Sequence, residues 1–250
     1  MNLVVFYHVW QHQDWELLFQ QQIMNLLFSG LLDQVKQVYI CCNGNQVLPI
    51  DHPKFIVKYN HHWDNESDTL NQLWKFSQFS PDTQVLYMHT QGVGYRVQTR
   101  LNKDSWRMFV EFLLIHQWKE CVDKLKDHDV IGVQWMNPSM LTINHIHRVP
   151  INQGIFYGNF WWANTNYLKT LSQQSLYQYD YFHRHYQINI PLDPEHERKI
   201  LRFNSELWVG SQSPRVYNIA DMNMENIPFS MYNENVFNYL VKQDEHNLYY

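Results

Sequence analysis

The sequence predicts an α/β protein with a mostly parallel central sheet, helices on both faces of that sheet and a more irregular C-terminal third. Short apolar runs alternate with segments of helical periodicity through the first half of the chain, as they do where crossover helices connect parallel strands. The 250 residues contain no internal repeat, low-complexity run or linker. One large domain over residues 1–250 is therefore expected, long enough to bury a core without disulfides.

The first predicted strand covers residues 3–9, which are apolar and rich in β-branched and aromatic side chains. Asp14 follows as an N-cap for a helix whose apolar residues recur at helical spacing until Gly30 ends it. A second strand is predicted over residues 35–42, and the turn signal Asn43-Gly44 stops it. This strand–helix–strand order forms the first unit of the predicted parallel sheet.

The next segments continue the same alternation. Residues 55–59 predict a third strand, and Ser67 can cap a helix that ends before Pro81. Residues 85–90 predict a fourth strand, which Gly92-Val93-Gly94 closes. This strand is the most hydrophobic, so we expect it at the centre of the sheet.

The second half of the chain predicts fewer and longer elements. An amphipathic helix is expected from about residue 104 to 126, because large apolar side chains recur there at helical spacing. Residues 130–136 and 155–163 predict a fifth and a sixth strand, and a helix is expected around residues 195–207.

Composition narrows the class of function. The formal net charge of −5 gives no sign of a nucleic-acid-binding surface. The three cysteines, Cys41, Cys42 and Cys121, do not make a disulfide framework and favour a reducing compartment. The apolar run at residues 3–6 lacks a basic flank and soon gives way to polar residues, so neither a signal peptide nor a membrane span is predicted. We expect a cytoplasmic protein.

Candidate ligand-binding residues lie where the predicted strands end, because ligands of open α/β sheets bind outside the carboxyl ends of the strands. Tyr7 and His8 lie near the end of the first strand, Asn43 follows the second, and His89 and Thr90 end the fourth.

The loop after the fourth strand predicts a diphosphate site. Gln91 precedes its glycines, whose backbone N–H groups can hold phosphate oxygens, and Arg96 and Arg100 supply guanidinium groups. The alternative is an ordinary strand end with a turn glycine. Neither G-x-x-x-x-G-K nor G-x-G-x-x-G occurs, so neither of these loops holds a nucleotide.

A dense aromatic segment at residues 157–163 predicts either a sugar site or a heavily packed strand. Trp161 and Trp162 are adjacent, so on a strand they point to opposite faces, and one can line a surface while the other enters the core. Gly158 and Asn159 leave room for a ligand and offer an amide for its hydroxyls. The alternative is a buried strand in which both indoles serve packing.

Six segments, in the same order along the chain, resemble motifs of one family of glycosyltransferase-like proteins. They are residues 69–74 (T-L-N-x-L-W), 85–92 (Y-x-H-T-K-G), 106–107 (W-R), 131–135 (G-x-N-W), 158–163 (G-N-F-W-W-A) and 206–210 (E-x-W-x-G). The resemblance implies a GT-A-like fold, the nucleotide-sugar-binding α/β sheet of many glycosyltransferases. Residues 1–136 would then be the nucleotide-binding half and residues 137–250 the acceptor-binding half.

The resemblance also implies roles for individual residues. Tyr7 and His8 would lie near the base of the donor and Asn43 near its ribose. His89 and Thr90 would approach the diphosphate, with charge supplied by Arg96 or Arg100. The sugar or acceptor pocket would be shaped by Trp135, Gly158, Asn159, Trp161 and Trp162.

Glu206 is the candidate catalytic base. Sugar transfer needs a carboxylate near the acceptor hydroxyl, and in the resembling class an acidic residue at a helix start late in the chain has that role. The alternative is a first-turn glutamate that stabilises its helix.

Two departures from the family bear on a metal cofactor. Gln91 stands where the family has lysine, and the fourth strand lacks the Asp-x-Asp that many GT-A enzymes use to hold Mn²⁺ or Mg²⁺. No metal ligands are assigned, and Mn²⁺ or Mg²⁺ stays a possible cofactor. Asp127-His128-Asp129 precedes its strand, so we expect it at the opposite edge of the sheet, in a solvated turn.

The function expected from these patterns is that of a glycosyltransferase of the hexosyltransferase type. It would move a sugar from a nucleotide-sugar donor to a saccharide or other hydroxyl acceptor, without nucleic acid and without a membrane span. The alternative is a non-catalytic carbohydrate- or nucleotide-binding module on the same fold. A nucleotidyltransferase is disfavoured because the first strand is not followed by a glycine-rich loop.

Overall fold

The computed structural model describes residues 2–60, 66–90, 106–136, 154–176 and 205–220. Gln91, Arg96 and Arg100 lie outside the described residues, as does most of the helix predicted over residues 195–207. Within the described residues no helix is long and apolar enough to cross a bilayer.

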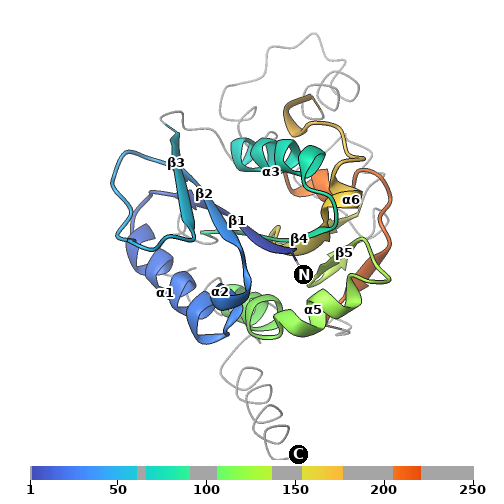
Figure 1. Cartoon of the computed structure of the whole chain (residues 1–250), viewed down its shortest axis with the longest axis horizontal. Helices are drawn as coiled ribbons and strands as arrows, with labels where there is room; N and C mark the ends of the chain where they lie inside the picture. The colour runs from blue at the N-terminus through green and yellow to red at the C-terminus, as the bar shows by residue number, and fades with distance from the viewer. Residues whose placement is uncertain (1, 61–65, 91–105, 137–153, 177–204, 221–250) are drawn as a thin grey trace, which may run out of the picture.

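A seven-stranded sheet in the order β3-β2-β1-β4-β8-β5-β9 forms the centre of the protein (Figure 1). Its strands are β1 (Asn2–Trp10), β2 (Gln37–Asn43), β3 (Phe55–Asn60), β4 (Thr83–His89), β5 (Val130–Gly132), β8 (Trp161–Asn164) and β9 (Val216–Asn218). The first four strands run parallel to one another, and β8 lies antiparallel between β4 and β5. The prediction of a mostly parallel α/β sheet is confirmed.

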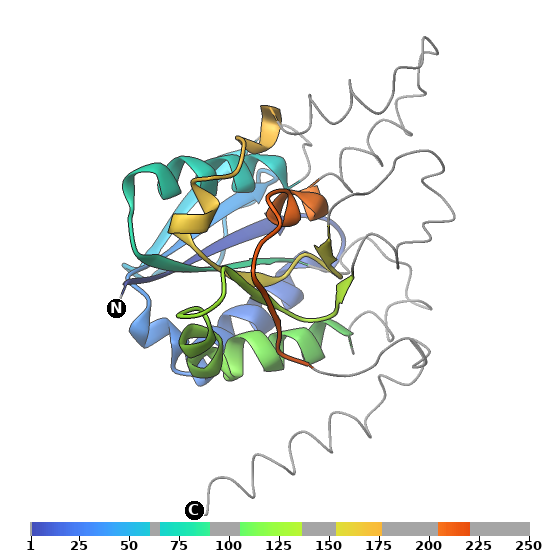
Figure 2. The same ribbon diagram turned by 90° about the vertical axis from the view of Figure 1, so that its right-hand side faces the viewer.

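Helices cover both faces of the sheet, as predicted (Figure 2). One face carries α1 (Trp15–Phe28), α2 (Leu31–Gln34), helical residues 106–111, the π-helix η1 (Phe112–His116) and α5 (Trp118–Lys124). The other face carries α3 (Ser67–Phe79), α6 (Thr165–Leu168), helical residues 205–207 and the 3₁₀ turn η3 (Trp208–Gly210). We call these two sides the α1 face and the α3 face.

Alternation along the strands divides the core into two layers. Val5 of β1 and Leu86 of β4 pack on the α1 face, whereas Phe6 and Tyr87 pack on the α3 face. This follows from the two-residue period of a strand, which sends successive side chains to opposite sides of the sheet. His8 and His89 continue the α3-face rows at the carboxyl ends of their strands.

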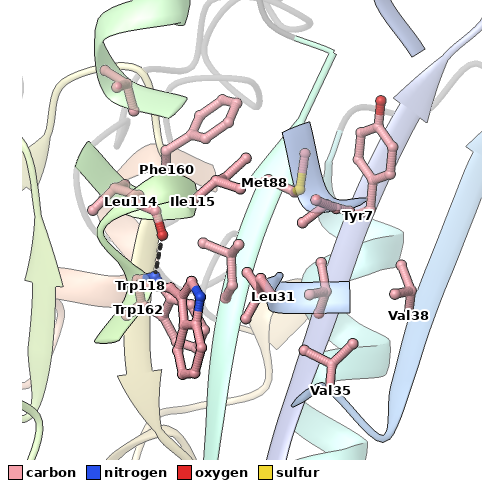
Figure 3. Close-up of a cluster of buried hydrophobic side chains, with 14 of the residues drawn as sticks. Tyr7, Leu31, Val35, Val38, Met88, Leu114, Ile115, Trp118, Phe160 and Trp162 are labelled. Carbon is pink, nitrogen blue, oxygen red and sulfur yellow. Dashed lines mark hydrogen bonds between the residues drawn. The ribbon is translucent and has the colours of Figure 1, made fainter. Parts of the chain in front are cut away.

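The two adjacent tryptophans of β8 follow the same rule. Trp162 lies in the core of the α1 face and donates a hydrogen bond from Nε1 to the Leu114 carbonyl at 2.8 Å (Figure 3). Trp161 lies in the core of the α3 face, and both indoles are 0% exposed. The prediction of opposite faces is confirmed. Of the two alternatives for this segment, the structure shows the buried strand in which both indoles serve packing, because helices cover both sides of β8.

Three predicted elements are interrupted in the structure. The strand predicted over residues 130–136 splits at Gln134, whose φ is +54°, into β5 and β6 (Trp135–Met136). The strand predicted over 155–163 splits into β7 (Ile155–Phe156) and β8 at Gly158 and Asn159, whose φ values are +85° and +52°. Each positive φ turns the chain out of the extended conformation. β6 and β7 pair with each other in a separate sheet.

The third interrupted element is the long helix predicted from residue 104. Over Phe112–His116 the chain forms the π-helix η1 in place of α-helical turns.

Two glycines allow η3 to pack against the small β6–β7 sheet. A Cβ on Gly210 would lie 1.9 Å from the Gly154 carbonyl oxygen, and a Cβ on Gly154 would lie 2.2 Å from the Trp135 ring. Trp135 also packs edge-on against Phe156, with ring centroids 4.8 Å apart. The glycine of the E-x-W-x-G motif is therefore required by a close approach of two backbone segments.

We predict that Gly210→Ala destabilises the protein by about 3 kcal/mol, because the added methyl group meets a backbone atom that cannot move aside. Gly30→Ala is the matched control. Nothing lies within 4 Å of its Cβ position, and only the φ of +70° opposes it, at about 1 kcal/mol. Urea unfolding of both variants measures the difference, and equal losses would contradict the packing argument.

Candidate functional site

The strand order changes direction at β1. The chain passes from β1 outward to β2 and β3, and then returns to form β4 on the other side of β1. In open α/β sheets such a reversal leaves a crevice at the carboxyl ends of the two strands concerned, and ligands bind there. His8 and His89 are paired residues at the ends of β1 and β4, so both lie at this position.

Both imidazoles are held by hydrogen bonds from the α3 face. His8 Nδ1 lies 2.9 Å from Thr69 Oγ1 in the first turn of α3. His89 Nε2 lies 2.7 Å from the Gly158 carbonyl oxygen. Because a carbonyl oxygen only accepts, Nε2 of His89 is the donor, and this contact fixes which ring nitrogen carries a proton.

The carboxylate of Glu66 lies at the centre of the site. Its Oε2 accepts hydrogen bonds from the Tyr87 hydroxyl at 2.7 Å and from Asn159 Nδ2 at 2.6 Å. Its Oε1 lies 3.6 Å from His89 Nδ1. Glu66 occupies the N-cap position of α3, where the helix dipole favours a negative charge. We call the buried group His8, Glu66, Thr69, Tyr87, His89 and Asn159 the Glu66 cluster.

The turn before β8 brings Asn159 to this carboxylate. Asn159 adopts a left-handed backbone conformation with φ +52°, which asparagine tolerates better than most residues. Its Oδ1 accepts a hydrogen bond from Trp161 Nε1 at 2.8 Å, and the Trp161 ring stacks on Tyr87 at 4.9 Å. Trp161 therefore supports two of the donors to Glu66, although its ring is closed to ligands.

Burial sets the charge of two members of the cluster. It lowers the pKa of His8 to about 4, with the charge of His89 adding to that effect and the charge of Glu66 opposing it. Burial also raises the pKa of Tyr87 well above its ordinary value, and the neighbouring Glu66 charge acts in the same direction. Near neutral pH, His8 is a neutral imidazole and Tyr87 a protonated donor.

Glu206 lies beside the Glu66 cluster, where residues 205–207 pack against the start of α3. Ser205 Oγ lies 3.5 Å from Ser67 Oγ, and the Glu206 charge contributes to the raised pKa of Tyr87. Glu206 is half-buried, whereas Glu66 is 7% exposed. The tertiary structure thus brings a second, half-buried carboxylate close enough for its charge to act on Tyr87, which bonds the first.

Several of the predicted site residues lie close together at the carboxyl edge of the sheet, and others do not. His8, His89, Gly158, Asn159 and Glu206 converge on one edge of the sheet. Their convergence is observed, and their roles stay predictions.

Tyr7 requires a correction. It points to the α1 face, is fully buried and donates a hydrogen bond to Gln22 Oε1 at 2.5 Å, so its ring has no surface for a nucleotide. The sugar contacts predicted for Trp161 and Trp162 are wrong for the same reason, since both indoles are closed within the core.

Thr90 and Asn43 lie at the predicted edge, where they form hydrogen bonds with backbone groups of neighbouring residues. Thr90 Oγ1 accepts a hydrogen bond from the Trp10 amide at 3.0 Å, and the Thr90 amide donates to the His8 carbonyl at 3.1 Å. The Asn43 carbonyl accepts from the Gln11 amide at 3.0 Å. Trp135 is half-buried. The contacts predicted for Thr90, Asn43 and Trp135 with a donor or a sugar stay predictions.

A second buried polar network supports His89 from the α1 face. Gln22 Nε2 donates to the His89 carbonyl at 3.0 Å and to Glu111 Oε1 at 2.7 Å. Glu111 also pairs with Arg107 at 3.0 Å, and both side chains are almost fully buried. The arginine of the W-R motif therefore helps to position the strand end that carries His89.

Sequence reasoning did not identify Glu66, Thr69 or Gln22 as site residues. A signal existed for Glu66, because it lies between the third strand and the start of the next helix, where the chain reaches the carboxyl edge of the sheet. The structure places Glu66 at the N-cap of α3, and the prediction that Ser67 caps this helix is wrong. No comparable signal marked Gln22, which lies in the middle of an amphipathic helix.

The described residues do not present an arrangement that suits a metal ion. No three His, Cys, Asp or Glu side chains converge as ligands in the part of the chain that the structure describes. In the Glu66 cluster, Oε2 of Glu66 already accepts two hydrogen bonds, and Nε2 of His89 donates to a carbonyl. Asp129 forms an ion pair with Arg215 at 2.8 Å before β5, at the opposite edge of the sheet, as predicted. We therefore derive no step through Mn²⁺ or Mg²⁺.

The cysteines do not supply a nucleophile. Burial raises the pKa of Cys41 to about 11 and that of Cys42 to about 12, and it also raises the pKa of Cys121. All three thiols stay protonated near neutral pH, which makes them unreactive.

A family model described as "Domain of unknown function (DUF8361)" matches residues 16–235, which is most of the chain. No curated protein matches the sequence.

We predict that Glu66→Ala lowers the free energy of unfolding by about 2–4 kcal/mol, because the Tyr87 hydroxyl and the Asn159 amide lose their buried acceptor. Glu16→Ala is the control. Glu16 also lies at a helix N-terminus but is exposed, so its loss is expected to stay below about 1 kcal/mol. Equal losses in urea unfolding would show that only the helix dipole is involved.

We predict that His8 makes stability depend on pH between about 4 and about 6.5. In this window the unfolded chain binds a proton at His8 and the folded protein does not, because the folded pKa is lowered to about 4. The free energy of unfolding therefore falls by roughly 3 kcal/mol as the pH is lowered through the window.

The matched variant is His8→Gln, whose amide can bond Thr69 but does not titrate. Subtracting its unfolding free energy from that of the wild type at each pH cancels the contributions of the other histidines. A difference that does not change between pH 4 and 6.5 would refute a neutral, buried His8.

Proposed function

The chain belongs to the DUF8361 family, a domain of unknown function, and from the fold and the residues at the strand ends we propose that it is a GT-A-like glycosyltransferase that moves a sugar from a nucleotide-sugar donor to a hydroxyl acceptor. The observation that carries this proposal is the buried carboxylate of Glu66 beside His89 at the carboxyl end of β4, with the half-buried Glu206 on the segment that packs against the start of α3. An open α/β sheet binds its ligand at such strand ends. The mostly parallel sheet and the motifs at its strand ends agree with the proposal.

The two carboxylates would have different tasks. Glu66 is buried and hydrogen-bonded to Tyr87 and Asn159, so it acts as a positioning residue for the turn at Gly158-Asn159 and for His89. Glu206 is half-buried and is the candidate base. As the acceptor oxygen bonds to the anomeric carbon, its proton passes to Glu206. The bond from that carbon to the diphosphate breaks, and the electron pair leaves with the diphosphate.

The donor would lie along the carboxyl ends of β2, β1 and β4. His8 and Asn43 lie at this edge, and Thr90 lies beside His8. Gln91, Arg96 and Arg100 follow directly in the chain, and we propose that the two arginines hold the diphosphate.

A non-catalytic carbohydrate- or nucleotide-binding module on the same fold is the second candidate. The observation that favours it is the engagement of His8 and His89 in hydrogen bonds within the protein, at Thr69 and Gly158. Such a module would bind the donor without turnover.

We predict that one nucleotide sugar from a panel of UDP, GDP, CMP and dTDP sugars raises the unfolding temperature. At about a hundred times its dissociation constant it adds roughly 2.7 kcal/mol, or about 5–10 °C for a chain of this size. Running the panel with and without Mn²⁺ measures metal dependence. Glu206→Gln is expected to keep this shift and to lose at least about a hundredfold in sugar transfer.

Glu120→Gln is the matched control. Glu120 lies in the first turn of α5, on the opposite face of the sheet, so neither the shift nor turnover is expected to change. Near-full turnover in Glu206→Gln would remove Glu206 as the base. A shift without any turnover in the wild type would favour the binding module, and no shift with any nucleotide sugar would remove the donor site.

A further inference from the structure

Helix α1 carries large apolar side chains on its outer side as well as on its inner side. Its inner side packs in the core, whereas Leu17, Met24 and Phe28 are exposed, Phe28 at 72%. Single exposed apolar residues are normal on a protein surface, but a row of them along one helix marks a surface that binds another molecule.

The spacing of this row is that of a helix–helix contact. Leu17, Gln21, Met24 and Phe28 are exposed and follow one another at intervals of four, three and four residues, so they lie on one side of α1. The same alternation of three and four places the a and d positions of a coiled coil along the line where two helices meet. We call this row the α1 seam, and it fits the side of another helix.

A neighbouring helical segment widens the apolar surface and fixes the middle of the α1 seam. Arg107 Nη2 donates a hydrogen bond to Gln21 Oε1 at 3.2 Å, which ties α1 to helical residues 106–111. Met108 follows Arg107 in this segment and is 44% exposed. The surface therefore spans two helices, and a surface that is already ordered loses little conformational freedom when it binds.

The charges at the two ends of the α1 seam indicate what covers it. Glu16 is exposed in the first turn of α1. Lys119 is exposed near the other end, because its Nζ lies 5.7 Å from the centre of the Trp118 ring and Trp118 Nε1 bonds the Ser29 carbonyl at 3.1 Å. A surface that is acidic at one end, basic at the other and uncharged between them complements a second copy of itself that runs in the opposite direction.

The composition of α1 disfavours a lipid or nucleic-acid surface as the partner. Its 14 residues include neither lysine nor arginine. A helix that binds an anionic lipid surface carries such residues on its polar side, and phosphates of nucleic acids are bound mainly by them.

We propose that the α1 seam is the interface of a symmetric homodimer, in which α1 packs antiparallel to α1 of a second copy. Leu17 of each copy then lies opposite Phe28 of the other, and Glu16 lies near Lys119. The inner side of the same helix carries Gln22, which bonds the His89 carbonyl. The dimer contact therefore lies behind the candidate site and leaves the α3 face open. This inference does not depend on the chemistry of that site.

Sedimentation equilibrium of the full chain at micromolar concentrations tests the dimer. The wild type is expected at twice the 30.5 kDa of one chain. Phe28→Glu is expected to raise the dissociation constant by about a hundredfold or more, because symmetry places the new charge against Leu17 twice in the interface. Phe79→Glu is the matched control. Phe79 is exposed at the end of α3, on the opposite face of the sheet, so the dimer is expected to persist.

A charge exchange tests the antiparallel arrangement. Glu16→Lys and Lys119→Glu are each expected to weaken the dimer by about tenfold, because each places like charges together at both ends of the interface. The double variant is expected to restore the wild-type dissociation constant, since opposite charges face each other again. A double variant that dimerises no better than the single variants would refute the antiparallel pairing.

Two other results would overturn the proposal. A monomeric wild type would leave the α1 seam to a different partner. A dimer that Phe28→Glu does not weaken, or that Phe79→Glu weakens equally, would place the interface elsewhere on the protein. Leu17→Glu changes the opposite end of the seam and gives the same test, should thermal unfolding show that Phe28→Glu does not fold.

Discussion

A carboxylate removed from water must be hydrogen-bonded on several sides, and the site is arranged around that requirement at Glu66. Its donors come from β4, through Tyr87, and from the turn before β8, through Asn159. Glu66 itself begins α3. One buried charge therefore joins a strand, a helix and a turn from different parts of the chain, and the positions of His89 and Gly158 depend on it.

The end of β4 is supported from both faces of the sheet. On the α3 face, the His89 ring bonds the Gly158 carbonyl, and on the α1 face, Gln22 bonds the His89 carbonyl. Gln22 is in turn held by Glu111, which pairs with the buried Arg107. Two polar networks in separate core layers thus fix a single residue, as a preorganised site requires.

The aromatic segment serves this arrangement through packing. Trp161 stacks on Tyr87 and bonds Asn159, and Trp162 ties β8 to the opposite helical layer. The indoles keep the donors of Glu66 in place and offer no face to a sugar.

The sequence by itself determined the order of strands and helices up to β4 and the edge of the sheet at which the candidate site residues lie. Apolar periodicity and turn residues are local signals, so they place His8, Asn43 and His89 at strand ends. Only the tertiary structure decided that Glu66 is the central residue and that Tyr7, Trp161 and Trp162 are closed within the core. Burial and pairing depend on contacts between residues far apart in the chain, such as Glu66 and Asn159 at a separation of 93 positions, and no local pattern records them.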